Sequence, residues 1–305
     1  MVNSKDRKII SGLRGIISSL HTPFLEDNSL DLNSLKNLID HTILTGCSGM
    51  LVGAVAGETS SLTIEEKQKV TEFCVNHNNN RIPLIVGCSA DNQRDRIALS
   101  KLAKEAGANW ILCQAPSNIK GKELLNCFNE ISEVGPDNIM IQDLSWTDNG
   151  MDDDDIILLF DNIEKFKGFK IEVLNSGPKY SRVLKATNHQ LHLSGGWAIM
   201  GMIEALNRGV HAFIPSTMET LYNRIYKLFI ENKIKEARNL FTKILPVLSF
   251  THQHIDISIK FSKMLRVKEG IFQTSLCRSP INNFDKYQVE EANSHIENIL
   301  HFQNK

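Results

Sequence analysis

Residues 138–174 read NIMIQDLSWTDNGMDDDDIILLFDNIEKFKGFKIEVL and contain the pattern that decides the fold. The apolar runs at 138–143 and 168–174 are short and bounded by Gly, Asn or Asp, which is typical of buried parallel strands. Between them, four aspartates at 152–155 precede IILLF, and negative charge is favourable at a helix N-terminus. The stretch therefore predicts a strand–helix–strand unit, with magnesium binding at the aspartates as a minor alternative.

The same alternation extends over most of the chain. Helical runs with local start signals separate the apolar runs, as after Asp31, where a periodic apolar run closes at Gly46. Eight such repeats favour a (β/α)8 barrel of the α/β class over an open sheet. The turn after the first run, HTPFLEDN, has no Gly-rich phosphate fingerprint, which argues against a dinucleotide site. The eight strand-like runs lie at 13–20, 49–55, 83–89, 109–114, 138–143, 168–174, 190–194 and 210–215.

The C-terminal part has a different pattern. From about Met218 onward the chain contains amphipathic helical runs and no further strand-like run. We expect one barrel domain at residues 1–232, followed by a helical extension at 233–305 that packs on the barrel.

Composition limits the classes of function. The 305 residues are 42% hydrophobic and 23% charged with a formal net charge of −1, so no basic field favours nucleic acid or an anionic membrane. The charged N-terminal residues 1–8 are not followed by a signal-peptide core, and no apolar run approaches the ~20 residues that span a bilayer. Six scattered cysteines without CxxC spacing fit reduced thiols better than disulfides or zinc. We expect a cytoplasmic protein with no metal and no cofactor.

The segment 168–174 also suggests chemistry. Alternation along a strand separates its side chains onto two faces. The apolar face carries Phe169, Ile171 and Val173, and the face expected to point into the barrel carries Lys170, Glu172 and Leu174. A lysine inside a barrel is unfavourable unless it is neutral, paired or reactive, and a neutral amine attacks a carbonyl to form an imine. From this pattern alone, a structural ion pair with Glu172 is an equal alternative.

Five motifs in a fixed order extend the argument from Lys170 to nearly the whole chain. They are GETSSLT at 57–63, IQDL at 141–144, Lys170 itself, LSGG at 193–196 and RGVHAFIP at 208–215. In this order they resemble the dihydrodipicolinate synthase / N-acetylneuraminate lyase family of class I Schiff-base aldolases, over residues 13–280.

The resemblance implies a barrel with a C-terminal helical domain, assembled as a homodimer or homotetramer. It implies that Lys170 forms an imine with pyruvate or another 2-oxo acid, which serves as an electron sink while a bond to the adjacent carbon is made or broken, in some reactions with an aldehyde as partner. Backbone N–H groups of the loop at 53–57 would hold the substrate carboxylate. The substrate contacts expected on this basis are at Val55, Ala56, Glu58, Gly195 and Gly196.

The chain departs from the family where protons are moved. The family's relay uses a tyrosine on the fifth strand, a threonine in the loop before Gly-Glu and often a second tyrosine after the fourth strand. Here these places hold Gln142, the pair Val55 and Ala56, and PSN at 116–118. Glutamine forms hydrogen bonds but does not take up or release a proton near neutral pH. We therefore expect neither dihydrodipicolinate synthesis nor ordinary sialic acid cleavage. A divergent subgroup of the family, with Gln-Asp at the tyrosine motif and Lys-x-Glu around the lysine, resembles this chain.

Two carboxylates are candidates to replace the relay. Glu172 could move protons beside Lys170 or form an internal ion pair with it, and Asp143 could contact substrate hydroxyls or cap a loop. His192 is expected to be a satisfied core histidine rather than a general base. The predicted catalytic set is Lys170, Glu172 and Gln142.

The leading functional hypothesis is a Schiff-base lyase that acts on a 2-oxo acid by aldol cleavage or condensation, although the same imine also supports dehydration and decarboxylation. The alternative is a catalytically silent barrel that binds a small oxo acid or serves as a scaffold.

Overall fold

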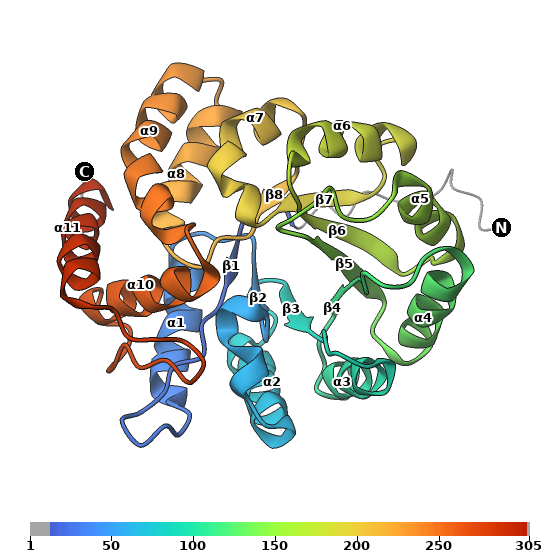
Figure 1. The fold of residues 1–305 in the computed structure, drawn as a ribbon, viewed down its shortest axis with the longest axis horizontal. Helices are drawn as coiled ribbons and strands as arrows, with labels where there is room; N and C mark the ends of the chain where they lie inside the picture. The colour runs from blue at the N-terminus through green and yellow to red at the C-terminus, as the bar shows by residue number, and fades with distance from the viewer. Residues whose placement is uncertain (1–12, 304–305) are drawn as a thin grey trace. The chain divides into compact units, whose positions relative to one another are not determined.

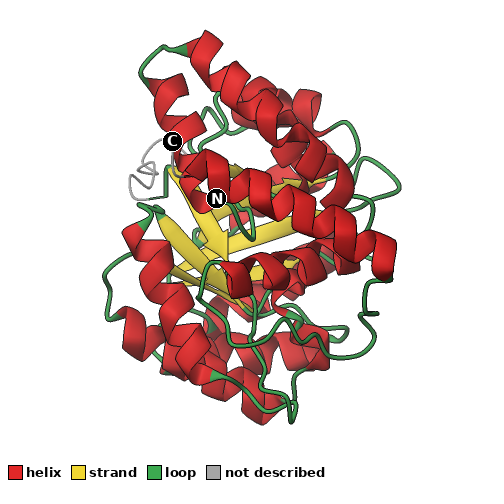
Figure 2. Cartoon of the chain, turned by 90° about the vertical axis from the view of Figure 1, so that its left-hand side faces the viewer, coloured by secondary structure: helices red, strands yellow, loops and turns green. Residues whose placement is uncertain are grey.

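Eight parallel strands follow one another in sequence order around a closed barrel. The structure is a computed structural model and describes residues 13–303, so the charged N-terminal residues discussed above lie outside it. Each strand overlaps one of the eight predicted runs, which confirms the (β/α)8 class; Figure 2 draws the strands in yellow and the helices in red. The strands are β1 (Gly15–Ser19), β2 (Gly49–Val52), β3 (Leu84–Gly87), β4 (Trp110–Gln114), β5 (Asn138–Leu144), β6 (Phe166–Glu172), β7 (His192–Gly195) and β8 (Ala212–Phe213).

Local sequence signals account for the starts of several helices. Asp31 accepts a hydrogen bond from the Ser34 N–H and caps α1, while Thr63 and Glu66 form a reciprocal capping box at α2. Asp152 is the N-cap of α5, which confirms that the run of aspartates begins a helix. The barrel helices are α1 (Leu32–Leu44), α2 (Ile64–Asn78), α3 (Gln93–Glu105), α4 (Gly121–Val134), α5 (Asp153–Asn162), α6 (Ser176–Ala186), α7 (Met202–Asn207) and α8 (Glu219–Ile230). Further helices are α9 (Ile234–Thr251), α10 (Ile255–Lys268) and α11 (Lys286–Gln303).

The chain divides into two compact units. The first unit holds residues 13–15 and 83–214, with β3 to β8 and α3 to α7. Its helices α3 to α6 lie outside the strands (Figure 1). Neighbouring strands are in a register that pairs Lys170 of β6 with Gln142 of β5 and with Ser194 of β7. This register places polar side chains from three strands side by side.

The second unit holds residues 16–82 and 215–303, with β1, β2, α1, α2 and α8 to α11. Its core contains a fully buried ion pair between Arg266 of α10 and Glu219 of α8. Ser18 of β1 donates a hydrogen bond of 2.6 Å to the same Glu219 carboxylate. The predicted domain boundary after residue 232 falls between α8 and α9, two helices of this unit.

Two features of residues 13–303 concern membrane-spanning helices and disulfide bonds. Within residues 13–303, no helix combines the length and the apolar character that crossing a bilayer requires. The six cysteines are free thiols, and five of them are buried.

Replacing Arg266 with leucine would leave the Glu219 carboxylate buried beside Ser18 without its guanidinium partner. We expect the free energy of unfolding to fall by about 3–5 kcal/mol, because breaking a buried pair by removing one partner leaves an uncompensated charge. Urea denaturation of Arg266→Leu and of Arg224→Leu, an exposed position on α8, measures this. Equal losses in the two variants would contradict the assignment.

Candidate active site

Lys170 lies in the middle of β6 and is buried, with 6% of its surface exposed. Its Nζ atom lies 2.8 Å from Oε2 of Glu172, two residues further along the same strand. The Gln142 side-chain amide on β5 donates a short hydrogen bond to the same Glu172 oxygen. The three residues predicted as the catalytic set therefore form one connected cluster, in which Glu172 contacts both of the others.

This cluster occupies the face of β5 and β6 that points away from the helices. The neighbouring residue Asp143 points the opposite way, since its Oδ2 atom lies 2.5 Å from Nζ of Lys179 on α6. Successive strand residues face opposite sides, so Gln142 and its register partner Lys170 face the barrel interior. The interior position of Lys170 matches the face expected from the alternation in its sequence.

Asp143 holds a loop. Its Oδ1 atom accepts the Met151 N–H at 3.0 Å, and Lys179 also donates to the Asn149 and Met151 carbonyls at 2.7 and 2.6 Å. Burial raises the pKa of the Asp143 carboxyl, and the Lys179 ammonium acts against that rise. These contacts correspond to the loop-capping alternative, with the carboxylate directed toward α6 rather than toward Lys170.

The glycines that follow Ser194 give the cluster its space. A Cβ atom at Gly196 would lie 1.9 Å from Oε1 of Glu172 and 2.7 Å from Cε of Lys170. No side chain fits there while Glu172 keeps its position. Gly195 ends β7 in register with Ile171, one position beyond Lys170 and Ser194.

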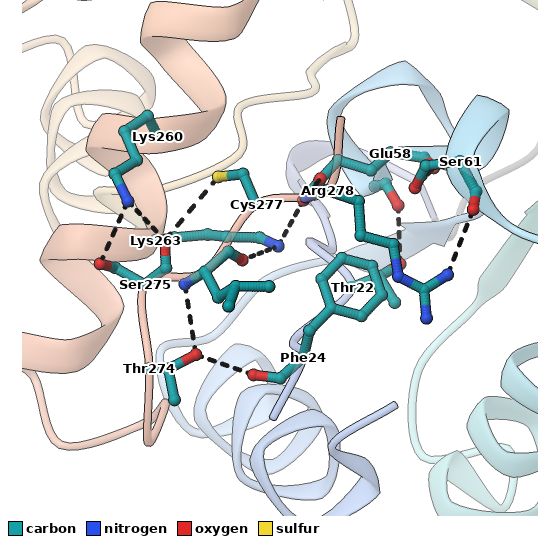
Figure 3. Close-up of polar contacts among 12 residues, drawn as sticks. Thr22, Phe24, Glu58, Ser61, Lys260, Lys263, Thr274, Ser275, Cys277 and Arg278 are labelled. Atoms are coloured by element: carbon teal, nitrogen blue, oxygen red, sulfur yellow. Dashed lines mark hydrogen bonds and ion pairs between the residues drawn. The ribbon is translucent and has the colours of Figure 1, made fainter. Parts of the chain in front are cut away.

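The predicted carboxylate-binding loop belongs to the second unit. Val55 and Ala56 lie in a 3-10 turn, η2 (Val55–Gly57), which is followed by Glu58 in the left-handed conformation at φ +55°. The Glu58 side chain is buried and forms an ion pair with Lys263 of α10, and it also accepts the Arg278 backbone N–H at 2.7 Å (Figure 3). Glu58 was expected to contact substrate, and in the structure its carboxylate is engaged by these two partners.

Two histidines pack together in the interior of the first unit. His192 of β7 is buried and stacks on His211, with ring centroids 5.3 Å apart. Burial lowers the pKa of His192 to about 3 and that of His211 to about 4. His211 Nδ1 accepts the Leu193 N–H at 2.9 Å, so both rings are neutral groups of the core.

Metal-binding residues are not gathered anywhere in the part of the chain that the structure describes, where no group of three His, Cys, Asp or Glu side chains has the geometry to hold an ion.

The chain resembles known proteins over nearly its whole length. The model of the dihydrodipicolinate synthetase family matches residues 12–299, nearly the whole chain. The chain belongs to this family. Its members include the 4-hydroxy-tetrahydrodipicolinate synthase of Neisseria gonorrhoeae, which is 27% identical over 249 residues, covering 77% of this chain and 82% of the relative. The synthase of a Sulfurihydrogenibium species is 29% identical over 231 residues, covering 74% and 78%.

Solved structures of the family share the fold. The crystal structure of dihydrodipicolinate synthase from Rhodopseudomonas palustris has a TM-score of 0.86 at 21% identity, covering 93% of this chain and 97% of that one. N-acetylneuraminate lyase from Fusobacterium nucleatum has a TM-score of 0.83 at 24% identity, covering 95% and 99%. Members of the dihydrodipicolinate synthetase family are lyases of the class I aldolase type, which sets the enzyme class of the chain.

Lys179, Lys263 and Arg278 were not found from the sequence, although they hold predicted site residues. Lys179 lies 36 residues from Asp143, and Lys263 lies 205 residues from Glu58. The one available signal was a lysine at a helical position flanked by apolar residues, as in SIKFSKML at 258–265. This pattern suggests burial but does not name the partner.

Gly196→Ala is expected to destabilise the first unit, because its methyl group would overlap the Glu172 carboxylate. Overpacking of this kind costs about 1–3 kcal/mol. Gly201→Ala is the matched control, since its Cβ would come no closer than 3.8 Å to a neighbour. Urea denaturation should separate the two variants, and equal stability would place Glu172 elsewhere.

The two core histidines predict a pH dependence. Their pKa values of about 3 and 4 lie below the ordinary 6.5, so the unfolded chain takes up protons first as the pH falls. The contribution of the two neutral histidines to the free energy of unfolding is therefore fully present above about pH 6.5 and decreases as the pH falls toward about 4. The free energy of unfolding, measured from pH 7 to pH 4, should fall less steeply in His192→Gln than in the parent. His301→Asn, at an exposed histidine on α11, should keep the parental slope.

Proposed function

We propose that the protein is a Schiff-base lyase in which Lys170 is the nucleophile toward pyruvate or a related 2-oxo acid. The observation that carries this proposal is the contact between Lys170 Nζ and Glu172 Oε2 at 2.8 Å inside the barrel. An amine must be neutral to attack a carbonyl, and a carboxylate at hydrogen-bond distance can accept the ammonium proton.

Glu172 also suits the later proton transfers. Attack of Nζ on the 2-oxo carbon gives a carbinolamine, and loss of its hydroxyl as water requires one proton. The protonated Glu172 can return the proton it took from Lys170, so that the iminium forms and the carboxylate is regenerated. The positive iminium then accepts the electron pair of the bond broken at the adjacent carbon.

Gln142 acts as a positioning residue in this proposal. Its amide donates to Glu172 and cannot transfer a proton near neutral pH, so it orients the carboxylate rather than relaying protons. Because the groups at 142, 55 and 56 do not titrate, we infer a reaction other than the formation of 4-hydroxy-tetrahydrodipicolinate. Aldol cleavage or condensation with an aldehyde partner is the favoured reaction, and dehydration or decarboxylation would use the same imine.

The carboxylate of the oxo acid is assigned to backbone N–H groups of residues 53–57, as the resemblance implies. Backbone donors do not depend on the side chains of Val55 and Ala56. A homodimer or homotetramer is the proposed assembly, by analogy with the family.

Borohydride reduction in the presence of pyruvate, followed by intact-mass measurement, tests the nucleophile. The parent is expected to gain one reduced pyruvate adduct per chain, and peptide mapping should locate it at Lys170. Lys170→Ala should gain none, whereas Lys167→Ala, on the same strand, should react like the parent. No adduct with any of a panel of 2-oxo acids would support the silent-barrel alternative.

The Glu172→Gln variant tests whether Glu172 transfers protons, independently of whether Lys170 is the nucleophile. This variant keeps the side-chain shape but removes the proton acceptor, so we expect adduct formation to slow by about 10²–10⁴-fold, the usual contribution of general acid–base catalysis. Single-turnover trapping at saturating pyruvate measures the rate. An unchanged rate would assign Glu172 a purely structural role.

A further inference from the structure

A cluster of charged side chains in the second unit joins the C-terminal part of the chain to the loop of residues 53–58. The cluster consists of Glu58, Lys263, Arg278, Glu66 and Phe24, and we call it the C-terminal clamp. Figure 3 shows Glu58, Lys263 and Arg278 of this cluster near Phe24.

Contacts from other segments of the second unit hold the backbone conformation of Glu58. It has a left-handed backbone between two 3-10 turns, η2 and η3 (Thr59–Ser61), and this conformation is unfavourable for a residue with a side chain. Both ends of its carboxylate are engaged, one oxygen by Lys263 Nζ and the other by the Arg278 backbone N–H at 2.7 Å. The orientation of this turn is therefore held from α10 and from the segment after it.

The side chain of Lys263 helps to hold Glu58 in place. It is fully buried, and besides Glu58 its Nζ atom donates to the Leu276 carbonyl at 2.8 Å and lies 4.3 Å from the Phe24 ring centroid. Burial lowers the pKa of its ammonium, and Glu58 acts against that shift. A buried lysine with these partners acts on the loop only through Glu58.

Arg278 holds the same loop from its other side. Its guanidinium forms two hydrogen bonds of 2.7 Å to the Glu66 carboxylate on α2, donates to the Ser61 carbonyl at 3.1 Å and stacks on Phe24 at 4.2 Å. A planar fork with two parallel bonds fixes direction as well as distance. Two residues that follow Glu58, Ser61 and Glu66, are thus tied to one arginine.

The remaining side of the loop is closed by the β1 end of the chain. Thr22 donates to the Gly57 carbonyl at 2.7 Å, and a Cβ at Gly57 would lie 3.0 Å from the Leu20 carbonyl oxygen. The Gly57 N–H donates to the Ala54 carbonyl at 2.9 Å within the turn. With Gly57 fixed from one side and Glu58 from the other, the N–H groups of Val55 and Ala56 are held in one orientation.

We propose that Lys263 and Arg278 are positioning residues for 2-oxo acid binding, which hold the backbone N–H groups of Val55 and Ala56 in place. Lys263 acts through the Glu58 carboxylate. The Arg278 guanidinium acts through Ser61 and Glu66, which keep the Arg278 backbone N–H against Glu58. This inference rests on the proposed function, because it assigns the substrate carboxylate to those donors. A tie that only stabilises the fold would change substrate binding and imine formation in parallel with stability, whereas a positioning tie changes binding and leaves the chemistry of bound substrate intact.

The experiment measures pyruvate adduct formation by borohydride trapping across pyruvate concentrations, in the full-length chain. Lys263→Met and Arg278→Lys are expected to raise the half-saturating pyruvate concentration by about tenfold or more, while the rate at saturation stays within about twofold. Lys260→Met is the matched control, because Lys260 donates to the Ser275 carbonyl at 2.9 Å from the same helix. It should behave like the parent. Loss of rate at saturation with unchanged half-saturation would overturn the proposal.

Hydrogen exchange separates this inference from the proposed function, since it needs no substrate. The amides of Gly57 and Glu58, which donate to the Ala54 and Val55 carbonyls at 2.9 and 3.0 Å, should lose protection in Lys263→Met and in Arg278→Lys but keep it in Lys260→Met. Unchanged protection in the first two variants overturns the positioning role. If Lys263→Met fails to fold, the double variant Glu58→Gln with Lys263→Met replaces it, because it leaves no buried unpaired charge. A parent that forms no adduct, with amide protection that still depends on Lys263, would refute the proposed function and leave the clamp as a purely structural tie.

Discussion

The buried charged side chains of this protein share one constraint. An ion removed from water needs an opposite charge within a few ångströms. The protein meets it with four buried pairs. They are Lys170–Glu172, Lys179–Asp143, Lys263–Glu58 and Arg266–Glu219. The first pair lies within β6 and the second joins β5 to α6. The third joins the loop after β2 to α10, and the fourth joins α8 to α10, so electrostatics as well as packing fixes segments within each unit.

The constraint also explains why Lys170 differs from the other buried cations. Lys179 and Lys263 each contact backbone carbonyls in addition to a carboxylate, which stabilises the charged ammonium. The contacts described for Lys170 are to one carboxylate, and that carboxylate also accepts from Gln142. The described surroundings of Lys170 therefore hold fewer acceptors for its Nζ atom than those of the other two buried lysines.

Much of the fold could be predicted because the spacing of apolar residues, and the Gly, Asn and Asp residues that bound each run, are local properties of the chain. The eight apolar runs, and the shared face of Lys170 and Glu172, follow from alternation along strands. Leu174 departs from the predicted face because β6 ends at Glu172 and the alternation ends with it. The partners of Asp143 and Glu58 could not be predicted, since they come from helices whose packing is set by tertiary structure rather than by spacing. The site was therefore predicted best where its residues share a strand or lie in register on adjacent strands.

The empty space at Gly196 has a consequence for how such a site can change. A side chain at position 196 and the carboxylate of Glu172 in its present position would occupy the same volume. Enlarging position 196 therefore requires a new rotamer or a different residue at position 172, so these two positions constrain each other in any redesign of the barrel interior.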